Sequence, residues 1–193
     1  MSKVSGISIA LLSSILLLQG CAALVVGGAA TTAVVAHDRR TTGTVVEDQA
    51  IELKVYDRLG KNQAFAQNSK INVTSYNKVV LLTGQANSEE LRRQAEQLAS
   101  QVEQVRRVVN EIELGSTASF GEHTRDVTLT TEVKLRLSNV DLPDFDALRV
   151  KVVTERGAVF LMGLLTKDEA HAVTEVVRYI SGVRRVVIVL EYI

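Results

Sequence analysis

The chain has a single thiol, Cys21, and this residue points most directly to covalent chemistry. A cysteine thiolate is a strong nucleophile. An apolar to weakly polar run, residues 7–18, ends just before it, and the small residue Gly20 directly precedes it. Without a second cysteine no intrachain disulfide can form, so the chemistry of Cys21 must be inferred from the residues before it.

Other residue types that catalyse reactions or bind metals form no recognisable constellation. The histidines are too far apart in sequence for a zinc site: His37, His123 and His171. The aspartates around Pro143 lack the glycine and the final glutamate of a calcium loop: Asp141, Asp144 and Asp146. No P-loop, G-x-G-x-x-G or G-x-S-x-G motif occurs. We therefore predict no enzymatic activity, no metal and no cofactor.

The first 20 residues have the layout of a bacterial secretory signal, with one early cation, Lys3, followed by the apolar run. That run is too short to cross a bilayer as a helix. Leu18-Gln19-Gly20-Cys21 resembles the lipobox of bacterial lipoproteins, although Gln19 is bulkier than the usual middle residue. The alternatives are a buried free cysteine or part of an uncleaved anchor.

The lipobox resemblance implies that residues 1–20 are removed and that Cys21 receives a diacylglycerol and a further acyl chain. At roughly 0.8 kcal/mol per buried CH₂, three chains make a near-permanent anchor. Ala22 follows, instead of the aspartate that retains many lipoproteins in the inner membrane. This implies an outer-membrane location on the periplasmic face. Residues 21–44 then form a lipidated tether, and an alternative places its apolar first half in the lipid headgroup layer.

The composition fits a folded body with no nucleic-acid partner. The 22 basic residues balance 22 acidic ones, whereas phosphate binding requires a concentrated basic surface. Hydrophobic residues make up 46% of the chain, enough to build cores without disulfides.

The body of the chain is an internal duplication. Val105-Arg-Arg-Val-Val109 recurs as Val183-Arg-Arg-Val-Val187, and residues 71–84 resemble residues 150–163, at an offset of 78 or 79 throughout. We predict a first domain over residues 45–115, a linker over residues 116–122 and a second domain over residues 123–193.

Periodicity predicts the order α-β-β-α-β in each copy. Asp48 and Asp126 each precede apolar residues at helical spacing, so they are expected to cap a first helix. Asn77 and Gly157 mark hairpin turns that need positive φ. A second helix is expected to open at Asn87 in one copy and at Thr166 in the other. Because this helix joins the last two strands, they should be parallel.

The closing strands are predicted over residues 105–114 and 183–193. Each begins with an arginine pair, in which one arginine should face solvent or an acidic neighbour. Anion binding by these pairs is the less favoured alternative. Glu103-Gln104 replaces Ser181-Gly182 before the strand, so the first turn is expected to have a different backbone conformation.

These residues carry a family resemblance. The two units, each with a hairpin ending in Leu-x-Gly or Met-Gly and a later Val-Arg-Arg-Val-Val strand, resemble tandem BON domains. Behind a lipobox, they are similar to the dual-BON-domain lipoproteins of the Gram-negative outer membrane. The expected fold class is therefore α+β, with two αββαβ domains. Each has a small three-stranded mixed sheet covered by two helices.

The BON resemblance implies phospholipid binding. On the first helix of the second copy, residues opposite the core are weakly charged and bordered by cations. The candidate phospholipid-binding residues are Arg125, Val127, Thr128, Thr131, Lys134, Leu135 and Arg136. Scattered exposed aliphatic residues are also normal on a soluble surface, which is the competing interpretation.

The expected function is a non-enzymatic outer-membrane lipoprotein that binds anionic phospholipid through its second domain. It would support envelope integrity, with a role at the division site as one expectation. The alternative is a periplasmic adaptor for an envelope-assembly or cell-wall-remodelling protein.

Mass spectrometry of the protein purified from membranes should detect a mature chain that begins at Cys21 and carries three acyl chains. The Cys21→Ala variant should keep residues 1–20 and carry no lipid. A retained Met1 with an unmodified thiol in the unchanged protein would contradict lipidation.

Overall fold

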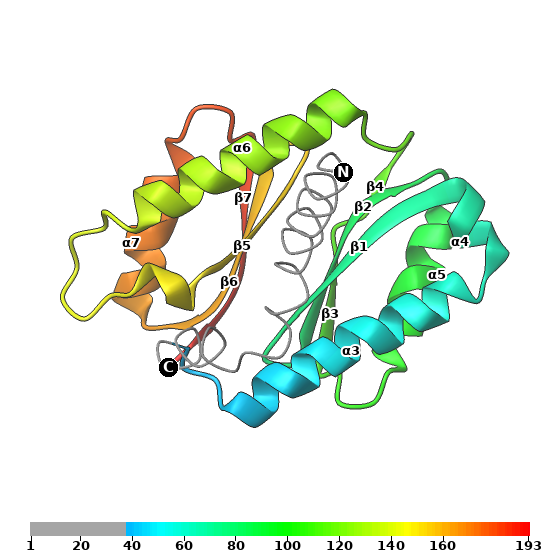
Figure 1. The fold of residues 1–193 in the computed structure, drawn as a ribbon, viewed down its shortest axis with the longest axis horizontal. Coiled ribbons are helices and arrows are strands. Elements are labelled where there is room, and N and C mark those ends of the chain that lie inside the picture. Colours follow the sequence, from blue (N-terminus) through cyan, green and yellow to red (C-terminus); the bar gives the residue numbers. More distant parts are fainter. Residues whose placement is uncertain (1–37) are drawn as a thin grey trace, which may run out of the picture. The chain divides into compact units, whose positions relative to one another are not determined.

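A computed structural model describes residues 38–193, and within it Asp38–Ile193 form one compact unit (Figure 1). The predicted signal peptide, Cys21 and the tether up to residue 37 lie outside the described residues. No helix in the described part is long and apolar enough to cross a membrane.

Each half of the unit contains the predicted order of elements. The first half comprises α3 (Thr42–Gly60), α4 (Gln63–Asn68), β1 (Ser69–Tyr76), β2 (Val79–Ala86), α5 (Glu89–Ser100), β3 (Arg107–Asn110) and β4 (Glu113–Leu114). The second comprises α6 (Phe120–Leu137), the 3₁₀ turn η2 (Ala147–Arg149), β5 (Lys151–Glu155), β6 (Ala158–Leu165), α7 (Lys167–Arg178) and β7 (Arg185–Tyr192). The α+β class and the duplicated order are confirmed. The short elements α4 and η2 were not predicted.

Each sheet is mixed, with the middle strand paired on both sides. Strand β2 is antiparallel to β1 and parallel to β3 and β4, while β6 is antiparallel to β5 and parallel to β7. The predicted parallel pairing is confirmed. In the first domain, however, the closing strand is split at residues 111–112, whereas β7 runs unbroken for eight residues.

The middle strands are buried on both faces, which explains their continuous apolar sequences. In β2, Val80 and Leu82 face the core under α3 and α5, while Val79 and Leu81 face the opposite side. Strand β6 alternates in the same way. One core therefore lies under each pair of helices.

The opposite faces of the two sheets form a third core. It combines residues of the first domain with residues of the second: Tyr76, Val79 and Leu81 with Ala158, Phe160, Met162 and Val189. Phe160 and Met162 are almost inaccessible to solvent. The prediction of helices on one face of each sheet is confirmed, and the other face is covered by the sister sheet.

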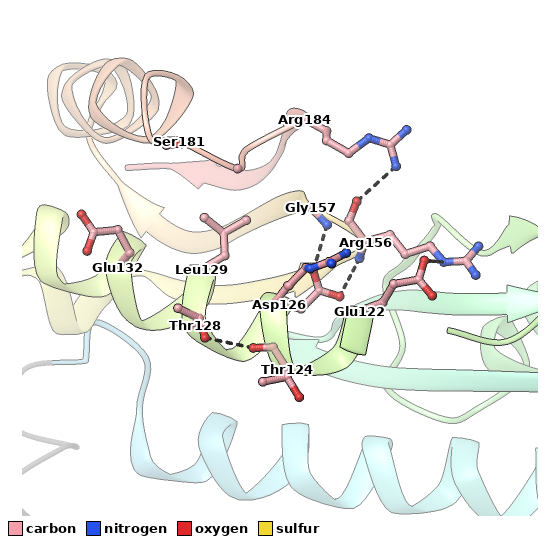
Figure 2. A pocket seen from close by; sticks show the side chains of 12 residues that line it. Glu122, Thr124, Asp126, Thr128, Leu129, Glu132, Arg156, Gly157, Ser181 and Arg184 are labelled. Atoms are coloured by element: carbon pink, nitrogen blue, oxygen red, sulfur yellow. Dashed lines mark hydrogen bonds and ion pairs between the residues drawn. The ribbon is translucent and has the colours of Figure 1, made fainter. Parts of the chain in front are cut away.

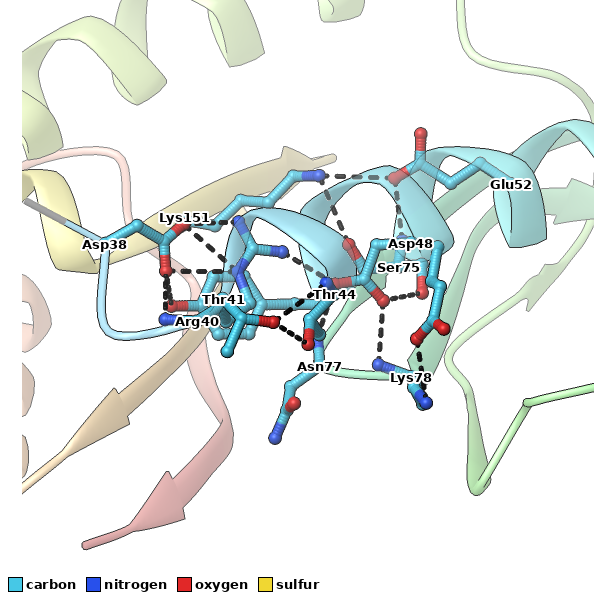
Figure 3. A network of polar contacts seen from close by, with 12 residues as sticks. Asp38, Arg40, Thr41, Thr44, Asp48, Glu52, Ser75, Asn77, Lys78 and Lys151 are labelled. Atoms are coloured by element: carbon cyan, nitrogen blue, oxygen red, sulfur yellow. Dashed lines mark hydrogen bonds and ion pairs between the residues drawn. The ribbon is translucent and has the colours of Figure 1, made fainter. Parts of the chain in front are cut away.

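Two buried aspartates tie the first helix of each domain to its hairpin turn. The carboxylate of Asp126 accepts hydrogen bonds from the backbone N–H groups of Arg156 and Gly157, at 2.8 and 2.9 Å (Figure 2). Asp48 accepts equivalent bonds from Asn77 and Lys78, both at 2.7 Å (Figure 3). Each aspartate thus satisfies two donors that a tight turn leaves unpaired.

Both turns have positive φ at their two central positions, 50° and 65° in the first domain and 47° and 74° in the second. These are the angles of a type I′ hairpin turn. The prediction that Asn77 and Gly157 adopt positive φ is confirmed.

The helix-capping predictions have mixed outcomes. Asp48 and Asp126 do not cap helices, because α3 and α6 begin more than a turn upstream, after Thr41 and Ser119. Helix α5 is capped by Ser88 and not by Asn87. Thr166 caps α7, with the predicted capping box to Glu169. The two aspartate predictions fail for one cause: an aspartate before an apolar period can accept tertiary hydrogen bonds instead of capping a helix.

The expected difference between the two turns before the closing strands is also wrong. Gln104 has a φ of 72° and Gly182 a φ of 94°, so both turns use a left-handed residue at the same place. The first domain tolerates this conformation with a side chain present.

The segment Asp38–Arg40, which leads into α3, contacts both domains. Arg39 donates two hydrogen bonds to the Glu169 carboxylate of the second domain, at 2.5 and 2.8 Å, and one to the Leu164 carbonyl. Arg40 donates to Asp48 of the first domain at 2.7 Å (Figure 3). Its guanidinium also lies 3.8 Å from the ring centroid of Tyr76. We call these contacts the entry clamp.

Electrostatics in the entry clamp favours the charged pairs. Burial opposes ionisation of Glu169, but hydrogen bonds from Arg39 and Thr166 outweigh it and hold the pKa of this carboxyl below its usual value. Burial raises the pKa of Tyr76 to about 12, so its ring stays a neutral platform for Arg40.

Glu169→Gln should flatten the acid dependence of stability. Because the folded-state pKa of Glu169 lies below its usual value of 4.5, its ionisation stabilises the fold above that pH. This contribution is lost as the pH falls through the folded-state pKa. Urea denaturation at about pH 6 and about pH 3 should show a larger loss of unfolding free energy in the unchanged protein than in the variant. The control is Glu175→Gln, which breaks only an exposed pair with Arg178. Identical losses for the unchanged protein and Glu169→Gln would contradict the assignment.

Asp126→Ala should lower the free energy of unfolding by about 3 kcal/mol, because it leaves two turn N–H groups without their acceptor. Asp57→Ala is the matched control, since Asp57 is exposed and pairs only with Lys61 in the next helical turn. Chemical denaturation measures both. A change below about 1 kcal/mol in Asp126→Ala would contradict the proposed tie.

Candidate functional site

The second domain begins with a well-defined helix start. Ser119 caps α6 and forms a capping box with Glu122, so the helix opens at Phe120, inside the predicted linker. The hydrogen bonds from Ser119 hold the pKa of Glu122 below its usual value. This start adds nearly two turns before Asp126 to the helix that the sequence predicted.

All seven candidate phospholipid-binding residues lie on α6 and are exposed in the described part of the chain. Val127 and Leu135 are 54% and 57% exposed. At 100° per residue, they and Thr131 share one side of the helix, opposite the buried Leu129, Val133 and Leu137. The structure therefore brings all seven candidate residues together on one helix.

Phe120 extends this side of α6 by almost two turns, and sequence reasoning missed it. Its side chain is 87% exposed, the highest value among the large hydrophobic residues of the described chain. Phe120 lies within 20° of Val127 around the helix axis when each residue turns the helix by 100°. The Ser119-x-x-Glu122 spacing was the available signal, because it marks a helix beginning at residue 120. We call the exposed side formed by Phe120, Thr124, Val127, Thr131 and Leu135 the outer face of α6.

The threonines on and beside this outer face have their hydroxyl donors satisfied within the helix. Thr124, Thr128 and Thr131 each donate a hydroxyl hydrogen bond to the carbonyl four residues earlier, at 3.0 Å. These hydroxyl groups therefore keep a hydrogen-bond acceptor when the helix face is transferred out of water. That lowers the cost of bringing the face against an apolar environment.

Cations border the outer face. Lys134 and Arg125 are exposed and form no ion pair within residues 38–193, while Arg136 pairs with Glu132 at 2.7 Å on the helix surface. An exposed pair of this kind contributes little and is readily exchanged for another anion. The outer face is thus apolar along its centre and positively charged along its margin.

The equivalent helix of the first domain has a different charge pattern. Helix α3 also exposes apolar residues, with Leu53 at 71% and Val46 at 59%. At the offset of 78, however, Glu47 corresponds to Arg125 and Asp57 to Leu135. At these two positions α3 therefore has acids where α6 has a base and an apolar residue.

The remaining sequence candidates show no catalytic arrangement in the described part of the chain. His123 and His171 are exposed, and no group of three potential metal ligands occurs in residues 38–193. In each arginine pair, one arginine meets an acidic neighbour, as predicted, and the structure places that acid in the other domain: Arg106 contacts Glu191, and Arg185 contacts Glu111 at 2.8 Å.

Comparisons with known proteins agree with the duplicated architecture. The family model described as BON domain matches residues 47–116 and again residues 125–193. The chain is 40% identical over 183 residues to the outer membrane lipoprotein DolP of Haemophilus influenzae, covering 95% of this chain and 94% of that one. It is 37% identical over 156 residues to a 21 kDa hemolysin of Actinobacillus pleuropneumoniae, covering 81% and 79%.

A solved structure of the C-terminal domain of CdsD, a structural protein of the type III secretion system of Chlamydia trachomatis, is a distant match. It is 10% identical, covers 72% of this chain and 96% of that chain, and superposes with a TM-score of 0.28. This likeness carries no functional information.

Proposed function

The chain belongs to the BON domain family and is an outer-membrane lipoprotein; on this premise we propose that it binds anionic phospholipid through the outer face of α6. In this proposal the Cys21 anchor holds the chain on the periplasmic face. The second BON domain then selects the lipids around it and so supports envelope integrity, including at the division site.

The observation that carries the proposal is the combination of Phe120, Val127 and Leu135, all more than half exposed, with a margin of cations on the same helix. Burying a large apolar side chain contributes roughly 2 kcal/mol, so three of them suffice for weak, reversible insertion at a bilayer interface. Each basic residue near an anionic surface adds about 1 kcal/mol. Neutral vesicles should therefore bind more weakly than anionic ones.

The first domain is the less suitable surface for the same reason. Glu47 and Asp57 on α3 would approach lipid phosphates and be repelled by them. Tyr56 is also engaged, because its hydroxyl accepts a hydrogen bond from the Val73 N–H at 2.9 Å. The two domains thus have similar folds, but the first helix carries more acids than bases in the first domain and equal numbers in the second.

Residues 38–193, which contain every contact described above, provide a soluble probe free of the acyl anchor. We expect this fragment to sediment with vesicles of phosphatidylcholine and phosphatidylglycerol and to stay in the supernatant with phosphatidylcholine alone. Leu135→Glu should weaken the sedimentation at least tenfold, because it places a charge in the apolar centre of the outer face.

The matched control is Leu53→Glu, which makes the same change at an exposed leucine of α3. It should bind as the unchanged fragment does. Loss of binding in both variants, or in neither, would contradict the assignment to α6. A fragment that stays in the supernatant with anionic vesicles would instead favour the role of a protein adaptor.

A further inference from the structure

A groove of about 570 Å³ lies along the flank of α6, between this helix, the hairpin turn at Arg156-Gly157 and the loop before β7 (Figure 2). We call it the α6 groove. Its lining includes Arg125, Leu129, Gly157, Gly182 and Arg184.

In the first domain, a side chain fills the position equivalent to the α6 groove. There the side chain of Lys78 spans the corresponding gap, with its ammonium 2.8 Å from the Glu47 carboxylate and 3.0 Å from the Gln104 side-chain oxygen. One cation is thus enclosed by an acid on the helix and an amide on the loop.

The second domain has changed all three of these residues. At the offsets of the duplication, Gly157 stands for Lys78, Arg125 for Glu47 and Gly182 for Gln104. The bridging side chain is gone, the loop side chain is gone, and the acid on the helix has become a base. Relative to the first domain, the groove lacks the bridging side chain and has a base in place of an acid on the helix.

Gly157 fits the floor of the groove closely. A Cβ at Gly157 would lie 3.0 Å from the Gly182 carbonyl oxygen and 3.1 Å from the side chain of Arg184. A side chain like that of Lys78 would press on Arg184, which is an arm of the groove. The small residue at this position keeps the groove open and Arg184 in place.

The charges that remain available in the groove are positive. Arg125 and Arg184 form no ion pair within residues 38–193, and in this part of the chain the Arg184 guanidinium donates one long hydrogen bond, 3.4 Å, to the Arg156 carbonyl. The acids of the lining are occupied. Asp126 accepts hydrogen bonds from the hairpin turn. Glu122 accepts a hydrogen bond from the Ser119 N–H and pairs with Arg156. Glu132 pairs with Arg136. A ligand therefore meets two uncommitted guanidinium groups above the apolar Leu129.

We propose that the α6 groove binds a phosphate ester, the head group of an anionic phospholipid, between Arg125 and Arg184. Guanidinium groups bind phosphate oxygens through paired, charge-assisted hydrogen bonds. Because Arg125 and Thr128 lie between the groove and the outer face of α6, the acyl chains of a bound lipid would extend onto that face. This inference rests on the proposed function and adds a defined head-group site to it.

The test uses the full chain in an uncharged detergent, followed by NMR at the backbone amides of Gly157 and Gly182. Dihexanoyl phosphatidylglycerol, added below its micelle concentration, should shift both amides saturably. Dihexanoyl phosphatidylcholine should shift them at least tenfold more weakly because its choline would approach the two arginines. Inorganic phosphate separates the two sources of the ligand chemistry. If it saturates these shifts as tightly as the short lipid does, the lipid assignment is overturned.

Arg184→Gln and Arg125→Glu should each weaken the phosphatidylglycerol titration at least tenfold, since each removes one arm of the site. Arg125→Glu restores the residue type of the first domain. Arg178→Gln, an exposed arginine on α7 outside the groove, is the matched control and should titrate as the unchanged chain does. Equal titrations in all four proteins would overturn the proposal.

The two proposals fail separately. If the 38–193 fragment sediments with anionic vesicles while the two glycine amides do not respond, the groove is not the head-group site and the outer face acts alone. If the amides respond but the vesicles leave the fragment in solution, the groove binds the head group of single lipids and the assignment of bilayer binding to the outer face is wrong.

Discussion

The two-sided burial of the middle strands is the constraint on which the architecture depends. A strand that is apolar on both faces cannot be satisfied by one layer of helices, because its second face would remain in water. Here that second face is covered by the sister domain, through Leu81, Phe160 and Met162. Each domain therefore needs the other, because each sheet covers the apolar face of its sister.

Within this shared frame, the two copies differ in how the same position is used. Both retain an aspartate that holds the hairpin turn, and both use a left-handed residue before the closing strand. Around these fixed points the side chains have diverged. Lys78 closes the first copy with an internal ion pair, while glycine opens the second. The proposed lipid site in the second copy thus depends on the missing Lys78 side chain as well as on the additional Arg125.

Periodicity and repetition were sufficient to predict the class, the order of elements and the parallel closing strands, because these depend on patterns that occur twice. The true helix starts were harder. Asp48 and Asp126 have the residue type and spacing of helix caps, but their partners are turns about 30 residues away. Local sequence cannot distinguish a carboxylate that caps its own helix from one that holds a distant turn.

The candidate site was predictable in part. The outer-face positions follow from helical geometry, whereas Phe120 was lost with the misplaced helix start. The groove was not accessible to sequence reasoning, because it is defined by a hairpin turn, a loop and a helix that meet only in three dimensions. The residues that create it, Gly157 and Gly182, appear in the sequence only as ordinary turn glycines.

The entry clamp would have a mechanical consequence if the chain is anchored at Cys21, as we propose. Tension on the N-terminal segment reaches the body at Asp38–Arg40, where Arg40 engages α3 of the first domain and Arg39 engages the start of α7 in the second. The load is divided between the two halves at the point of attachment. Pulling therefore strains two sets of charged contacts at once, and neither half bears the whole force alone.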